Sequence, residues 1–228
     1  MSQSSLFSGW LIIFNIKPAI MKSKYLILIF LLTNIYCNAQ DFCRVENGYA
    51  YFVDNKKAKG VDFKIRIPEH WTIKEGSRPN VVAIMQTEYM SFMLMIKEYY
   101  TFLSRNQSKE VYKSGFFENA LVEELWERGF TVQDLKKEEC TIDSYPAEKI
   151  TYTCLCSLPN LESQTTIVHV EYFLFYEDYV IKMGGWVYGK EALEYICPEN
   201  VRCEQIIESA LANFNSIAHS LVFFDHYK

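Results

Sequence analysis

The chain has 228 residues, half of them hydrophobic, and its formal net charge at neutral pH is −5. This length accommodates one domain of ordinary size with a substantial core. An acidic chain without a block of Lys or Arg is a poor nucleic-acid binder and gains nothing from an anionic lipid surface, so we expect neither partner.

Residues 1–39 are predicted to lie outside the folded domain. A basic start at Met21 precedes an apolar run at 25–35, and Cys37 and Ala39 supply small side chains at the two positions that signal peptidase reads, with cleavage after Ala39. This order is typical of a secretory signal peptide, and the apolar run is too short to span a membrane. We therefore expect translation to start at Met21, after an upstream extension, and residues 40–228 to form a single domain.

The leader predicts that the mature chain is secreted or periplasmic and has no stable membrane span. A lipoprotein acylated at Cys37 is disfavoured, because Tyr36 stands where such sites carry a small residue. Cleavage removes three Lys and no acidic residue, so the mature chain has 20 basic and 28 acidic residues and a formal charge of −8.

Six cysteines remain after cleavage: Cys43, Cys140, Cys154, Cys156, Cys197 and Cys203. An even number in an exported chain is typical of disulfide bonding. Cys197 and Cys203 form the best pair, closing a small loop at a gain of about 2 kcal/mol. Cys154 and Cys156 lie on one strand face, too far apart for an easy mutual bond. Their candidate partners are Cys43 and Cys140. Zinc at Cys154 and Cys156 is the alternative, but without a CxxC pair or suitably spaced His we expect no metal or cofactor.

Two hairpin-like units are predicted in the first half of the domain. The first contains an edge strand at Tyr49–Val53 and a strictly alternating strand at Phe63–Ile67. The second joins Val81–Met85 to Ser91–Ile96. Four methionines belong to this second unit: Met85, Met90, Met93 and Met95. They are expected to fill the core, with a soft-metal site for Cu(I) as the alternative.

A helix and a four-strand meander are predicted next. Phe117, Leu121 and Leu125 recur at helical spacing before Gly129, which indicates an amphipathic helix. Period-two alternation between Cys140 and Trp186 then predicts four antiparallel strands.

The third strand of the meander, Thr165–Phe175, is predicted to be central because both of its faces carry apolar residues. Gly184-Gly185 in the fourth strand indicates a bulge or the close approach of another segment. A second helix is expected from about Val201, and the apolar stretch Leu221–Phe224 either docks on the sheet or meets a partner. Runs of strands with segregated helices predict an α+β fold with a single antiparallel β-sheet flanked by helices.

With these elements in place, the chain resembles the PsbP-like α/β/α sandwich family, which includes the PsbP, Mog and DcrB proteins. The resemblance spans Asp62 to Ala218 and is carried by these segments: Phe63–Ile67 running into Pro68 and Trp71, Val81–Met85, the helix before Gly129, Thr141-Ile142-Asp143 with Pro146-Ala147, Thr165–Val187 and the closing helix. His70 before Trp71 and Ser144-Tyr145 before Pro146 depart from the family's glycines. The resemblance implies a small, mostly non-enzymatic module that binds proteins or assists membrane complexes.

The sequence contains no GxSxG, P-loop, GxGxxG or HExxH motif. His169 and Glu171 are the one acid–base pair on a single element. Two residues apart on a strand, they would share one face and serve general acid–base catalysis if a cleft lay over them. A half-exposed strand face is the alternative reading of the same pair.

Three functions remain in view. The first is an exported, non-catalytic interaction module that binds an unidentified protein partner through a surface rich in Tyr and Phe and assists an envelope complex. The second is a periplasmic immunity-type protein whose acidic surface neutralises a toxin. The third is a small hydrolase that uses His169 and Glu171. A concave pocket holding both side chains would favour the enzyme, and a flat aromatic patch would favour the binders.

Overall fold

The computed structural model describes residues 42–99, 103–157, 164–197 and 202–224, so the predicted leader, Met21 and Cys37 lie outside them. The described chain contains two antiparallel sheets, and the single sheet flanked by helices predicted from the sequence is therefore wrong. Within the described residues, no helix has the length and apolar character needed to cross a membrane.

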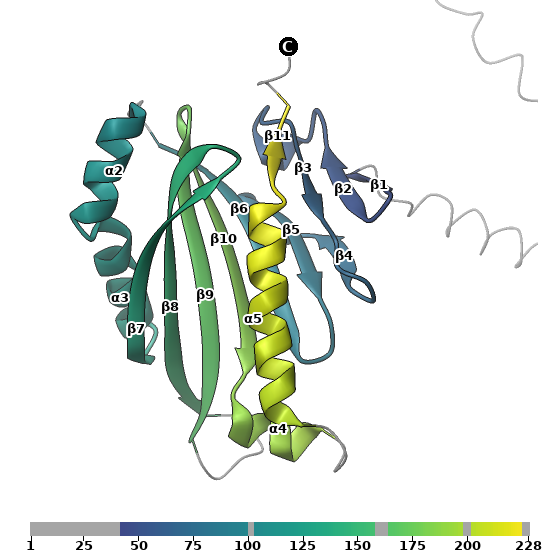
Figure 1. Ribbon diagram of the computed structural model, residues 1–228, viewed down its shortest axis with the longest axis vertical. Coiled ribbons are helices and arrows are strands. Elements are labelled where there is room, and N and C mark those ends of the chain that lie inside the picture. Colours follow the sequence, from purple (N-terminus) through teal and green to yellow (C-terminus); the bar gives the residue numbers. More distant parts are fainter. Residues whose placement is uncertain (1–41, 100–102, 158–163, 198–201, 225–228) are drawn as a thin grey trace, which may run out of the picture. The chain divides into compact units, whose positions relative to one another are not determined.

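The larger sheet has seven strands in the order β4-β5-β6-β10-β9-β8-β7 (Figure 1). Their bounds are β4 Thr72–Glu75, β5 Val81–Gln86, β6 Met90–Glu98, β7 Thr131–Ile142, β8 Tyr145–Ser157, β9 Gln164–Tyr176 and β10 Tyr179–Tyr188. The meander predicted between Cys140 and Trp186 is confirmed as β7 to β10, with β9 in a central place between β8 and β10.

The smaller sheet has four strands in the order β1-β2-β3-β11. Their bounds are β1 Arg44–Glu46, β2 Tyr49–Phe52, β3 Phe63–Arg66 and β11 Val222–Phe223, and the short 3-10 helix η1, Lys56–Ala58, joins β2 to β3. The single-sheet prediction failed here because alternation identifies a strand with one buried face but not the sheet that it joins. The chain reverses after β3, where His70 has φ +64°, and β3 pairs instead with the C-terminal β11.

One hydrophobic core lies between the smaller sheet, one face of the larger sheet and α5, Cys203–His219. Phe214 of α5 packs at 5.9 Å from Phe92 and edge-on at 6.1 Å from Trp71, measured between ring centroids. Gly185 of β10 faces the same ring, and a Cβ there would lie 2.6 Å from it. The close approach predicted for the glycine pair is therefore confirmed, and the register of β10 runs through both glycines without a bulge.

A second core lies on the opposite face of the larger sheet, under α2, Arg105–Lys113, and α3, Phe116–Glu127 (Figure 1). Phe117 of the predicted helix stacks on Phe173 of β9 at 4.6 Å. The sequence missed α2, which begins at a capping box formed by Ser104 and Gln107. It also missed α4, Lys190–Ile196, which precedes α5.

Candidate functional site

A groove runs between α3 and strands β6 and β10, on the α2 and α3 side of the larger sheet. It consists of two adjoining hollows of about 280 Å³ and about 220 Å³. Four residues line both hollows: Lys97, Leu121, Glu124 and Lys182. We call the two hollows together the α3 groove. α3 forms one wall of the groove, and side chains of β6 and β10 line the rest of it.

The carboxylate of Glu171 is the centre of the larger hollow. Tyr152 of β8 donates its hydroxyl to Glu171 Oε1 at 2.9 Å, and Lys182 Nζ lies 2.6 Å from Oε2. Glu171 is 8% exposed, so the pair is largely shielded from water. Gly184 stands directly opposite Glu171 in the β9–β10 register, and the missing side chain leaves room for the carboxylate. Burial, and then the negative charge of Glu171, raise the pKa of Tyr152 above its ordinary value.

His169 lies beside this cluster on the same face of β9. Its ring stacks flat on Tyr152, with 4.8 Å between centroids and 1° between planes. Burial, and then the nearby positive charge of Lys182, lower the pKa of His169 to about 4. The imidazole is therefore neutral at pH 7. In the described part of the chain, His169 makes no hydrogen bond to a side chain, and Tyr152 contacts both residues, stacking on His169 and donating to Glu171.

The structure thus brings the two sequence-predicted residues, His169 and Glu171, into one concave hollow. Sequence reasoning did not identify Tyr152 and Lys182 as their neighbours. The signal was present, because the two-residue turn Glu177-Asp178 fixes the β9–β10 register and places Lys182 diagonally across from Glu171. The methionines divide between core and groove: Met85 and Met90 belong to the core on the α5 side, whereas Met93, half-buried, and Met95, buried, line the larger hollow.

The predicted cysteine pairs are not bonded in the structure. Cys43, Cys140 and Cys197 carry free thiols, and the side chain of Cys156 lies outside the described residues. Cys140 packs on the α5 side of the larger sheet and Cys154 on the α2 and α3 side. Cys140 pairs with Ala147, and Ala147 and Cys154 point to opposite faces of β8 because they are an odd number of residues apart. A bond between those two would have to cross the sheet.

Cys197 and Cys203 remain the best predicted pair. Cys197 ends α4 and Cys203 begins α5, and the two helices are in contact. Burial, and then the neighbouring Cys203, raise the pKa of the Cys197 thiol. The two thiols therefore lie close enough to interact, and their disulfide stays a prediction.

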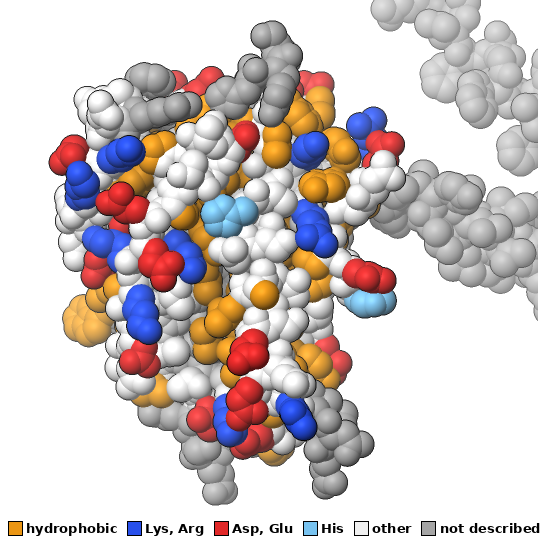
Figure 2. All heavy atoms as spheres, viewed as in Figure 1, with side chains coloured by type: hydrophobic (Ala, Val, Ile, Leu, Met, Phe, Trp, Pro, Cys, Tyr) orange, Lys and Arg blue, Asp and Glu red, His pale blue; other side chains and the backbone are white. Residues whose placement is uncertain are grey.

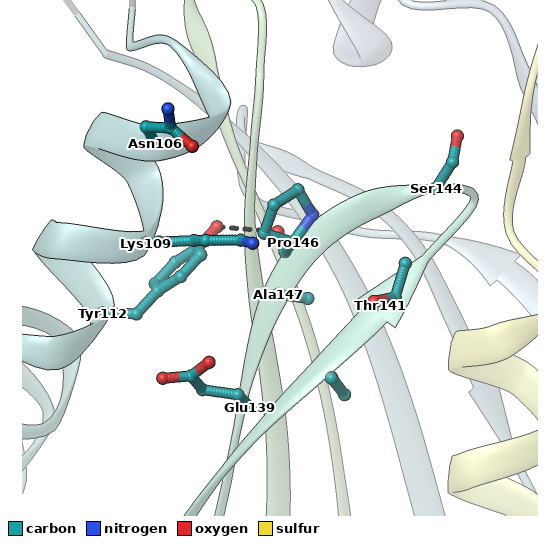
Figure 3. A pocket seen from close by; sticks show the side chains of 9 residues that line it. Asn106, Lys109, Tyr112, Glu139, Thr141, Ser144, Pro146 and Ala147 are labelled. Carbon is teal, nitrogen blue, oxygen red and sulfur yellow. Dashed lines mark hydrogen bonds between the residues drawn. The ribbon is translucent and has the colours of Figure 1, made fainter.

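A third hollow of about 360 Å³ lies between α2 and the β7–β8 hairpin (Figure 3). Lys109 and Tyr112 reach from α2 toward the hairpin, Glu139 projects toward them from β7, and Ser144 points away at the hairpin turn (Figure 3). The Tyr112 hydroxyl donates to the Pro146 carbonyl at 3.0 Å and accepts from the Phe175 amide at 3.2 Å. These bonds attach α2 to the sheet, so we assign this hollow a structural role.

On the α5 side of the molecule, acidic and basic side chains alternate over the β7 and β8 strands (Figure 2). Ion pairs account for part of this pattern, for example Lys149 with Glu138 at 3.0 Å. The strand face seen from this side is therefore mixed in charge and not a single acidic surface.

Comparison with known proteins finds similarity in structure and none in sequence. No family model and no curated protein sequence matches the chain. Among solved structures, the chain is similar to the solution structure of cyanobacterial PsbP (CyanoP) from Synechocystis sp. PCC 6803, with a TM-score of 0.45 and 13% sequence identity over 79% of this chain and 95% of that one. PsbP belongs to the group that the sequence pattern resembles, but a similarity at this level assigns neither family membership nor function.

Proposed function

We propose that this protein is an exported, non-catalytic binding module that holds its ligand or partner segment in the α3 groove. One observation carries the proposal. The groove is concave, partly apolar and preformed, while the ionisable groups on its floor are already bound to one another. Preformed apolar hollows with a few fixed polar groups are where proteins bind ligands.

The state of His169 and Glu171 argues for binding over catalysis. A general base is most effective when its pKa lies near the working pH, and a histidine with a pKa of about 4 takes up protons poorly at pH 7. Glu171 is engaged by Tyr152 and Lys182 and would have to break a 2.6 Å ion pair to act on a substrate. Both groups therefore stabilise the groove floor in this arrangement.

The small hydrolase stays a second candidate, because one concave hollow does hold His169 and Glu171. Replacing His169 by Gln separates the two functions: a hydrolase would lose its turnover, whereas a binding module would retain its partner. The immunity-type alternative draws no support from the face in Figure 2, where the charges over β7 and β8 are mixed and not the acidic surface that would suit a basic toxin.

Comparative capture tests the proposal. The full chain, tagged at its C-terminus, is incubated with its native envelope fraction alongside the variant Met93→Trp, whose larger side chain would fill the groove floor. Val122→Trp is the matched control, since Val122 is 39% exposed on α3 and does not line the groove. We expect wild type and control to retain the same stoichiometric partner or ligand and Met93→Trp to lose it. Equal retention by all three, or no retention by any, would overturn the proposal.

A further inference from the structure

The charges around the α3 groove do not balance, although the protein as a whole is acidic. Seven charged residues line its two hollows: Arg78, Lys97, Arg128 and Lys182, with Glu98, Glu124 and Glu171. Each of the three acids is already bound to a cation. Glu171 pairs with Lys182 at 2.6 Å, Glu124 with Arg128 at 2.6 Å, and Glu98 with Lys59 at 2.5 Å.

Arg78 and Lys97 are the cations left over. Both are exposed, and within the described ranges neither lies within 4 Å of a carboxylate. Lys97 lines both hollows and therefore lies where they join, and Arg78 lines the larger one. The groove thus offers two uncompensated positive charges in a chain with a formal charge of −5. A ligand with a negative charge would compensate the charges of Arg78 and Lys97.

The walls between these charges are apolar. The smaller hollow is bounded by Phe117, Phe173 and Val180, and the larger by Met93, Met95 and Trp186 among others. Methionine side chains adapt to ligands of varied shape. Hollows of about 220 Å³ and 280 Å³ each lie just below the usual range for small-molecule sites, so they suit a narrow chain better than a bulky ring system.

From this combination we infer that the α3 groove binds an amphiphilic monoanion: an apolar chain ending in one carboxylate, with the carboxylate at Lys97 and Arg78 and the chain along the apolar walls of the groove. A polyphosphate would leave the apolar walls unused, and a neutral lipid would leave the two cations unpaired. The inference rests on the proposed function, because it names the ligand of the same groove. Lys182 does not join the carboxylate, since Glu171 holds it.

Titration calorimetry with the full chain tests the inference, with decanoate as the probe and decan-1-ol as the neutral molecule of the same chain length. The variant is Arg78→Gln with Lys97→Gln. The matched control is Lys109→Gln with Lys136→Gln, which removes the same charge from exposed positions outside the groove. We expect one decanoate per chain, bound at least tenfold more tightly than decan-1-ol and weakened by added salt. The groove variant should lose at least tenfold in decanoate affinity and the control should lose little.

Two outcomes would overturn the inference while the proposed function stands. One is decan-1-ol binding as tightly as decanoate. The other is no binding of either probe by a protein that still shows the Met93-dependent capture described above. Absence of both probe binding and Met93-dependent capture would refute inference and proposed function together. Equal loss of affinity in the groove variant and the control would also refute the inference, because it would show that decanoate affinity depends on the net charge of the protein and not on the two groove cations.

Discussion

Glu148 of β8 is a buried carboxyl without adequate compensation, and its removal should stabilise the protein. It is 1% exposed, its Oε2 has no hydrogen-bond partner among the described residues, and its one ion pair, with Lys137, is long at 3.8 Å and shared with Glu118. Burial raises the pKa of Glu148 from its ordinary 4.5 to about 7, against the lowering effect of Lys137. We therefore expect Glu148→Gln, which keeps the shape and removes the charge, to increase the free energy of unfolding at alkaline pH.

The sign and size follow from proton linkage. Between pH 4.5 and about 7 the folded state holds a proton on Glu148 that the unfolded state has released, so stability falls as pH rises through this window. At about 1.4 kcal/mol per pKa unit, the loss reaches at most about 3 kcal/mol above pH 7. Glu148→Gln should therefore match wild type near pH 4.5 and exceed it by about 1 to 3 kcal/mol at pH 8.

Urea unfolding of the full chain from pH 4.5 to 8.5 measures this difference. Glu123→Gln is the control, because Glu123 is an exposed acid on α3 and its replacement should leave the pH profile unchanged. The reasoning is refuted if Glu148→Gln is less stable than wild type at pH 8, or if its advantage is the same at every pH.

His169 should make the free energy of unfolding depend on pH in the opposite direction. Its pKa is lowered to about 4, so the unfolded state takes up a proton that the folded state refuses as pH falls from 6.5 to about 4, and stability falls with it. In wild type the two residues offset each other between pH 4.5 and 6.5. His169→Phe, which keeps the ring stacked on Tyr152, should therefore gain stability relative to wild type as the pH is lowered to 4.5 and not at pH 7. If His169→Phe gains no stability over wild type at pH 4.5, the lowered pKa of His169 is contradicted.

Two further pairs of variants test packing and charge in the sheet by the same urea assay. Gly185→Ala places a Cβ 2.6 Å from an α5 ring and should cost about 1 to 3 kcal/mol, whereas Gly184→Ala meets nothing nearer than 3.4 Å and should cost much less; equal costs would show that the ring moves aside. Glu171→Gln leaves Lys182, 15% exposed, without its counter-charge and should cost about 3 kcal/mol or more, while Glu171→Gln with Lys182→Met should recover most of that loss. A double variant no better than the single one would refute the pairing.

The sequence predicted best what local periodicity determines. Alternation placed His169 and Glu171 on one face of a central strand. Helical spacing identified the helix that contains Phe117 and packs on that strand. It failed where pairing depends on residues far apart in the chain. Nothing local to β3 indicates that its partner lies in β11, and for this reason one sheet was predicted where two exist.

The candidate site was half predictable for the same reason. Residue types drew attention to His169 and Glu171, but their chemistry depends on Tyr152 and Lys182 from neighbouring strands, which hold the carboxylate and leave the imidazole neutral. Register could be worked out from the tight turn at Glu177-Asp178. The burial that lowers the pKa of His169 could not be predicted from the sequence, because it depends on where α3 lies above the sheet.

The pairing of β11 with β3 also constrains how the chain can fold as it is made. Phe223 donates its amide to the Asp143 carboxylate at 2.7 Å, and its strand covers the edge of β3. Until β11 has been synthesised, Phe63 and its neighbours have one open edge able to pair with another chain. Native closure of the smaller sheet therefore waits for a strand that is made long after β3.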